Sequence, residues 1–121
     1  MTDRPAGSQS YLQELDSTLM RLSPNLPSNA KPECKRFFGG AAAYVDGRIF
    51  MTLTTAGLAL KLPENLRTQL LGEGGKPLRY FAKGHIKKEY VVLPDASARS
   101  PTKLVRWVAA SMAYVTERSA S

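Results

Sequence analysis

Cysteine and histidine are almost absent from this chain, which has one of each among 121 residues. Cys34 can therefore form no internal disulfide, and Cys34 together with His85 cannot make up a zinc cluster. The ten acidic residues are scattered singly, so neither a paired general acid and base nor a run of metal ligands appears. These residue types indicate a protein that is not an enzyme, with no catalytic residues, no metal and no cofactor.

A small enzyme that relies on Cys34 or His85 is the weaker alternative. Lys31, Lys35 and Arg36 would favour the thiolate of Cys34 and so lower its pKa. A small, half-buried strand residue is the interpretation that we favour. No G-x-S-x-G turn accompanies His85 for a hydrolytic triad, and we expect this histidine on the surface of a basic loop.

Long apolar runs are also missing. No stretch approaches about 18 apolar residues, and residues 1–30 lack the apolar segment of a signal peptide, so we expect a cytoplasmic protein with no membrane association. Hydrophobic residues make up 43% of the chain and charged residues 22%, as in ordinary globular domains. We expect a flexible N-terminus at residues 1–9, a single domain at 10–118 and a frayed C-terminus at 119–121.

Negative charge is scarce relative to positive charge, and the net charge is +7. A basic surplus favours a polyanion such as nucleic acid, or an acidic partner protein; a solubilising surface charge is the alternative. The candidate contact residues form one dense group and one small group: Arg79, Lys83, His85, Lys87 and Lys88, then Lys35 and Arg36. Tyr80, Phe81 and Tyr90 lie among the first group, and cations beside aromatic rings suit phosphate contact with base stacking. No recognised reader motif accompanies them, and lysines on an edge strand also prevent edge-to-edge aggregation.

The clearest local pattern runs from Phe37 to Leu62 and predicts a three-stranded antiparallel meander. Asp46-Gly47 is a strong signal for a type I′ hairpin turn, and Ala56-Gly57 predicts a second turn. With two-residue loops, the expected pairs are Tyr44 with Ile49, Ala42 with Met51, Leu53 with Leu60, and Met51 with Leu62. Side-chain alternation then gives one apolar face, made of Ala42, Tyr44, Ile49, Met51, Leu53, Leu58, Leu60 and Leu62. Arg48, Thr52, Thr54, Lys61 and Phe50 fall on the other face.

The first strand of the meander is expected to start at Cys34–Phe38, with Gly39-Gly40 as an interruption. A double glycine inside a strand predicts a bulge or a close approach of another backbone. A phosphate-binding loop is the less favoured alternative, because such loops need a Gly-Lys-Ser/Thr ending and a following helix.

Helical patterns flank the meander. A capping box at Ser10 precedes leucines at helical spacing and predicts a helix to Leu22. Pro63 at the first helical position and Gly72 at C′ bound a second helix. Ser100 as N-cap and Pro101 at N1 begin the last one, whose expected core positions are Leu104, Trp107, Val108, Met112 and Val115. Two strands, near Leu78–Phe81 and through Glu89–Leu93, come between the second and last helices.

These elements indicate an α+β fold in the order α-β-β-β-α-β-β-α, a mostly antiparallel sheet with helices packed on it.

Several segments together resemble the N-terminal domain of the TfoX/Sxy competence regulators. The matching segments are Phe37-Phe38-Gly39-Gly40, Tyr44-Val45-Asp46-Gly47-Arg48-Ile49-Phe50, Leu58-Ala59-Leu60-Lys61, Tyr80-Phe81, Lys88-Glu89-Tyr90-Val91-Val92-Leu93-Pro94, and Leu104 to Trp107-Val108. The resemblance spans about Phe37 to Val115. It implies an α+β domain with the element order given above, here as a stand-alone, single-domain member.

The resemblance also carries expectations about function. Proteins of this family act as positive regulators of DNA-uptake genes and are thought to work with a general transcription activator. No catalytic residue or cofactor is associated with the motif, so none is expected here. We expect a non-catalytic regulatory module with a protein partner in transcription; direct nucleic-acid binding through the Arg79–Lys88 region, and a homodimer formed through a sheet edge or a helix face, are open alternatives.

Overall fold

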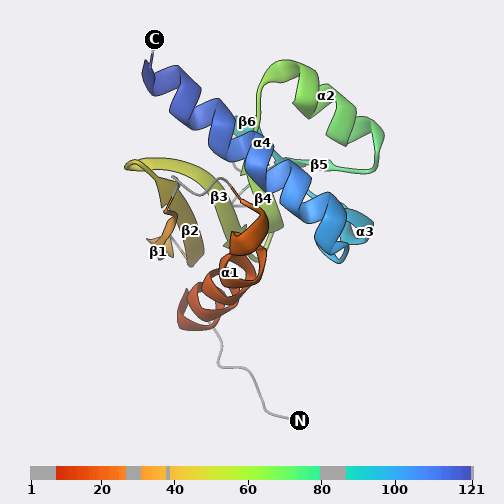
Figure 1. Cartoon of the computed structure of the whole chain (residues 1–121). Coiled ribbons are helices and arrows are strands. Elements are labelled where there is room, and N and C mark those ends of the chain that lie inside the picture. The colour runs from red at the N-terminus through yellow and green to blue at the C-terminus, as the bar shows by residue number, and fades with distance from the viewer. Residues whose placement is uncertain (1–7, 27–30, 38, 80–86, 121) are drawn as a thin grey trace.

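The computed structural model describes residues 8–26, 31–37, 39–79 and 87–120. Within these residues the chain forms one antiparallel sheet of six strands in the order β1-β2-β3-β4-β6-β5, with the long helices on one side of it (Figure 1). The helical elements are α1 (Ser8–Leu22), a 3-10 turn η1 (Ser23–Asn25), α2 (Glu64–Gly72), α3 (Asp95–Ala98) and α4 (Pro101–Ala120). The strands are β1 (Glu33–Phe37), β2 (Gly40–Val45), β3 (Arg48–Thr54), β4 (Gly57–Lys61), β5 (Lys76–Leu78) and β6 (Lys87–Val92). The α+β class is confirmed.

The first expected strand is two strands. β1 and β2 pair antiparallel with Phe37 opposite Gly40, so the double glycine belongs to a reversal of the chain and not to a bulge within one strand. The expected close approach of another backbone does hold at Gly40, where a Cβ atom would meet the carbonyl oxygen of Leu53. Glycine is required here because the backbone of the neighbouring strand β3 leaves no room for a side chain.

The turn at Asp46-Gly47 is confirmed. Both residues have positive φ, 53° and 74°, and Tyr44 pairs with Ile49 as expected. Beyond that pair a β-bulge shifts the register, and Met51 lies opposite Ala43. The expected pair of Ala42 with Met51 is therefore wrong.

The bulge changes which side chains enter the core. Phe50 is the extra residue on β3, so Phe50 and Met51 are consecutive and yet both lie in the core with 0% exposure. On β2 the core residues are Ala41, Ala43 and Val45. Strict alternation predicts Ala42, Tyr44 and Ile49 on the core face; the bulge breaks this alternation, and all three fall outside the core cluster.

The second turn lies one residue earlier than expected. Thr54 pairs with Gly57, so the turn residues are Thr55 and Ala56, and Thr54 Oγ1 accepts a hydrogen bond from the Ala56 N–H at 3.1 Å. Gly57 opens β4 with φ of 112°, a conformation that L side chains rarely adopt.

The earlier turn replaces both expected pairings across it. Leu53 pairs with Leu58, and Met51 with Leu60. Since this is a slip of two residues, side-chain parity survives: Leu60 and Leu62 are fully buried in the core, with Leu58 packed against it.

The helices differ from the expectations mainly at their ends. α1 begins at Ser8 and not after an N-cap at Ser10; Pro63 is the N-cap of α2, and Gly74, with φ of 107°, lies beyond its end. α4 begins as expected, with the Lys103 N–H 3.3 Å from Ser100 Oγ. Its five expected core positions are 0–4% exposed. β5 and β6 each begin two residues before the expected strand, and α3 was not expected.

α4 is joined to the sheet at the bulge. Ser111 is fully buried, and its Oγ lies 2.8 Å from the carbonyl oxygen of Phe50 and 2.7 Å from that of Lys61. A bulged residue is left out of the strand ladder, so its carbonyl needs another donor. The Ser111 hydroxyl supplies that donor and fixes α4 across β3 and β4.

Candidate interaction site

The structure separates the two basic groups that the sequence singled out. Lys35 and Arg36 are exposed on β1, at one edge of the sheet, whereas Arg79 and Lys88 are exposed near β5 and β6, at the other edge. Lys83 and His85, with Tyr80 and Phe81, lie outside the described residues, and Lys87 is described only as the first residue of β6. The described residues therefore form no single basic patch from these two groups.

The sheet face that carries no described helix has small residues in its middle and lysines toward its edges. One row across the strands, from β1 to β5, is Lys35, Ala42, Thr52, Ala59, Val92 and Lys76. Lys61 pairs with Tyr90 two residues along from Ala59 and Val92, and so on the same face. The Lys35 ammonium lies 5.4 Å from the centre of the Tyr44 ring. This face has cations and tyrosines, spread over the width of the sheet.

Cys34 does not have the chemistry of a nucleophile. It lies on β1 beside Leu12, Gln13 and Asp16 of α1. Burial, followed by the negative charge of Asp16, raises the pKa of the Cys34 thiol to about 11. The alternative of a low-pKa thiolate is therefore wrong. Within the described residues, no group of three or more His, Cys, Asp and Glu could hold a metal ion.

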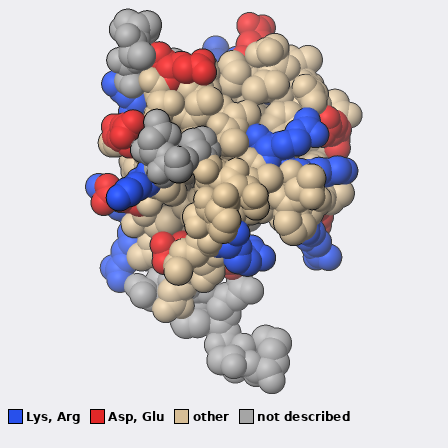
Figure 2. Space-filling model, viewed as in Figure 1, with Lys and Arg blue, Asp and Glu red and all other residues tan. Residues whose placement is uncertain are grey.

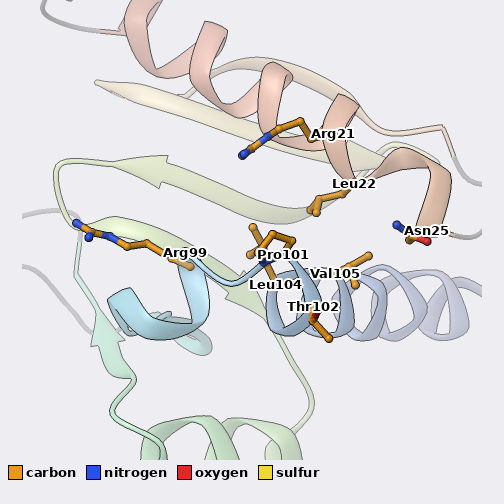
Figure 3. Close-up of a pocket in the computed structure, with 9 residues that line it drawn as sticks. Arg21, Leu22, Asn25, Arg99, Pro101, Thr102, Leu104 and Val105 are labelled. Atoms are coloured by element: carbon orange, nitrogen blue, oxygen red, sulfur yellow. The ribbon is translucent and has the colours of Figure 1, made fainter.

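A groove that the sequence did not predict lies between the end of α1 and the junction of α3 with α4 (Figure 3). Its volume is about 650 Å³, and its lining residues are Arg21, Leu22, Asn25, Ala98, Arg99, Pro101, Thr102, Leu104 and Val105. Leu22 and Leu104 are buried and Val105 is half-buried, so the floor is apolar. The groove exists because the last turn of α1 and the first turns of α4 diverge from a shared core.

Two exposed arginines stand at this groove. Arg21 is in the last turn of α1, with Nη2 3.4 Å from Thr18 Oγ1, and Arg99 caps the C-terminus of α3. Within the described residues, neither has an acidic side chain within 4 Å. Figure 3 shows both side chains extending to the side opposite Asn25, with Arg99 directed away from Pro101 and Leu104 and the ends of the two arginines apart. Among the described residues, the site therefore offers two guanidinium groups that have no acidic partner, beside an apolar floor.

No pattern in the sequence pointed to this pair. Arg21 reads as an ordinary cation at a helix C-terminus, where it complements the helix dipole. Arg99 follows a helix of four residues that the sequence did not predict. Both arginines line one groove because α1 and α4 pack on the same side of the sheet (Figure 1). Figure 2, from that side, shows Lys and Arg interspersed with Asp and Glu and not gathered in one patch.

The residues of the matched motif segments mainly have structural positions. Phe50 and Trp107 are core residues, Asp46 and Gly47 form the turn, and Pro94 is the N-cap of α3. Phe37 on β1 and Tyr90 on β6 are each half-buried, and Phe38 is outside the described residues. Gly47, Arg48 and Lys61 come together in a second, smaller pocket of about 370 Å³, near Val115 and so toward the C-terminal end of α4.

None of the helices in the described part of the chain is long and apolar enough to cross a membrane. No curated protein matches the sequence. The model of one family, described as the TfoX N-terminal domain, matches residues 28–115. This match extends from just before β1 to Val115 of α4 and includes the meander, the bulge and the start of α4, so this chain belongs to the TfoX N-terminal domain family.

Proposed function

We propose that this protein is a non-catalytic regulatory module that acts by binding a partner protein. The observation that carries the proposal is the groove at the α1 and α3–α4 junction, with its apolar floor and its two arginines that have no described acidic partner. Protein interfaces combine an apolar centre with a polar rim, and arginine is enriched in them. The family resemblance supports a role in the regulation of transcription together with a transcription activator, and we place this role in the cytoplasm as part of the proposal.

A non-catalytic role agrees with the state of Cys34. A thiol with a pKa of about 11 is protonated at neutral pH, and the thiolate is the reactive form. The test is a broad activity screen on the wild type, Cys34→Ala and His85→Ala. We expect no turnover in any of the three; turnover that either substitution abolishes would contradict the proposal.

Affinity purification from the protein's own cells, after brief cross-linking, tests partner binding. The retained protein is then produced pure and mixed with the purified chain in an isothermal titration. We expect a defined stoichiometry and a saturable complex. Retention of nucleic acid alone, or no binding between the two purified proteins, would reject a protein-binding role.

Direct nucleic-acid binding is the second candidate, and the sheet face that carries no described helix favours it. Lys35 and Tyr44 lie toward the β1 edge of that face, and Lys61, Lys88 and Tyr90 lie toward the β5 edge, with the fully buried Ala42, Thr52 and Ala59 between them. Cations beside aromatic rings suit contacts with single strands. If phosphate contacts matter, affinity for random DNA falls steeply with salt. Removing the charges of Lys83, Lys87 and Lys88 tests the basic stretch, and removing that of Lys35 tests the opposite edge. A mobility shift that is absent even at low salt would reject this candidate.

A further inference from the structure

The groove between α1 and the α3–α4 junction has the layout of a site for one apolar side chain. Leu22 and Leu104 close its floor with 5% and 3% exposure, and Val105 is half-buried beside them. A volume of about 650 Å³ exceeds what one side chain fills, so backbone and neighbouring residues of an occupant also fit. Asn25 and Thr102, both exposed lining residues, have polar groups for that backbone.

The positive charge of the groove favours a negatively charged occupant. Arg21 and Arg99 are positive, and no described acidic side chain lies within 4 Å of either. Their side chains extend to the side opposite Asn25 with their ends apart, so an occupant reaches both through separate carboxylates (Figure 3). A guanidinium group binds a carboxylate through two parallel hydrogen bonds, a geometry that lysine cannot offer. An occupant with carboxylates next to its apolar side chain therefore meets both arginines.

The same observations separate a peptide from other anions. The arginines are on the exposed rim and not in the buried interior, whereas a small-molecule site encloses its ligand and its polar contacts. No aromatic side chain is among the described residues that line the groove, so bases have no ring on which to stack. An apolar centre with a charged rim is the layout of a protein interface.

We propose that this groove binds an acidic segment of the partner protein, with one leucine-like or aromatic side chain on Leu22 and Leu104 and neighbouring carboxylates on Arg21 and Arg99. The inference rests on the proposed function and specifies the partner's chemistry and the surface that receives it. It also assigns specificity: an acidic, apolar segment binds, and a basic or purely acidic segment does not. The charged contacts are solvent-exposed, so binding weakens as salt rises.

A random dodecapeptide library, selected against the full chain, tests the proposal. We expect selected peptides with Asp or Glu beside a large apolar residue. Fluorescence anisotropy then measures their affinity for the wild type, Arg21→Glu, Arg99→Glu and the double variant. Each reversal should weaken binding at least about tenfold, because placing like charges together costs more than the roughly 1.4 kcal/mol that corresponds to a tenfold change in affinity. Arg48→Glu, an exposed arginine toward the other end of α4, changes the net charge equally and should leave affinity unchanged.

A charge exchange separates direct contact from damage to the fold. The selected peptide is synthesised with Lys in place of its acidic residues, and we expect it to bind the double variant better than the wild type. Selection of no peptide, of peptides without acidic residues, or of peptides that bind the double variant as tightly as the wild type would overturn the inference. Displacement of the peptide by millimolar pyrophosphate or by a single-stranded DNA 20-mer, at concentrations too low to act by raising the ionic strength, would also overturn the inference.

The natural partner gives the final distinction. If affinity purification with the double variant still retains the partner that the wild type retains, the module binds elsewhere, and only the groove assignment fails. If the wild type retains no partner that binds in pure form, the proposed function itself fails.

Discussion

Two regions of α4 differ in how they meet the rest of the molecule. In the middle of the helix, Trp107 is 4% exposed and Val108 fully buried, and the Ser111 Oγ lies within hydrogen-bond distance of two carbonyl oxygens of the sheet. In the first turn, Pro101 and Thr102 are exposed and line the groove. The middle is fixed by contacts on several strands, whereas the start has one side open toward α1.

This difference separates stability from binding along a single helix. Removing a side chain from the middle leaves a cavity or an unpaired polar group, and both lower the free energy of unfolding. Removing a charge at the groove breaks no described ion pair and opens no cavity. We therefore expect substitutions in the middle to change stability and substitutions at the groove to change affinity, each with little effect on the other property.

Trp107→Ala is expected to have the largest effect. Truncating a buried tryptophan lowers the free energy of unfolding by about 3–5 kcal/mol. Urea denaturation followed by circular dichroism measures it, because the only tryptophan is lost. Leu71→Ala, on a side chain that is 42% exposed, is the control and should cost under about 0.5 kcal/mol. A loss below about 1 kcal/mol for Trp107→Ala would show that the middle of α4 is not a principal part of the core.

Ser111→Ala isolates the polar contact at the bulge. The substitution leaves the carbonyls of Phe50 and Lys61 without this buried donor, and we expect a loss of about 1–3 kcal/mol. Ser23→Ala removes a solvent-exposed hydrogen bond from the Ser23 hydroxyl to the Met20 carbonyl, and it should change the free energy of unfolding by less than about 0.5 kcal/mol. Equal urea midpoints for the two variants would contradict the role of Ser111 in fixing α4.

The bulge also marks where sequence reasoning succeeded and where it failed. Asp46-Gly47 was predictable because its positive φ angles restrict the residue types, and the spacing of Trp107 with its neighbours indicated the core face of α4. The extra residue at Phe50 was not predictable, because alternation assumes a regular ladder. The hydroxyl that satisfies the Phe50 carbonyl is on Ser111, far along the chain. The slip of the second turn was harmless because a shift of two residues keeps the same faces.

The candidate site was less predictable than the fold. The sequence indicates two separate basic groups as candidate contacts, and the structure places Lys35 and Lys88, one from each group, toward opposite edges of one sheet. Arg21 and Arg99 carry no local signal, and only the packing of α1 and α4 on the same side of the sheet brings them to one groove. Sites built from distant segments depend on tertiary packing, which a pattern along the chain does not encode.

The reactivity of Cys34 tests the packing of α1, the other long helix, because α1 lies over this thiol. With its pKa raised from 9.0 to about 11 by burial and by Asp16, the thiolate fraction at neutral pH falls about a hundredfold, partly offset by the greater nucleophilicity of the more basic thiolate. We expect alkylation by iodoacetamide to be about tenfold slower in the folded than in the urea-unfolded chain at pH 8.

The pH profile of the Cys34 reaction supplies the sign of the effect. The folded-state pKa is above the unfolded value, so the contribution of this thiol to stability is present below pH 9 and is lost as pH rises toward about 11. An alkylation rate that levels off near pH 9 in the folded protein would contradict burial of the thiol under α1.

Arg21→Glu and Arg99→Glu should have the smallest effect on stability, although they should have a large effect on peptide binding. Arg21 is in the last turn of α1, where a negative charge opposes the helix dipole, so its reversal should cost about 0.3–1 kcal/mol. Arg99 follows the C-terminus of the short helix α3, where a negative charge is unfavourable, and lies two residues before α4, where it is favourable, so its reversal should be close to neutral. Thermal denaturation at low and high salt measures both, and the difference between them should shrink as salt rises. A loss above about 2 kcal/mol for Arg99→Glu would mean that this arginine supports the fold, and the separation of stability from binding along α4 would not hold.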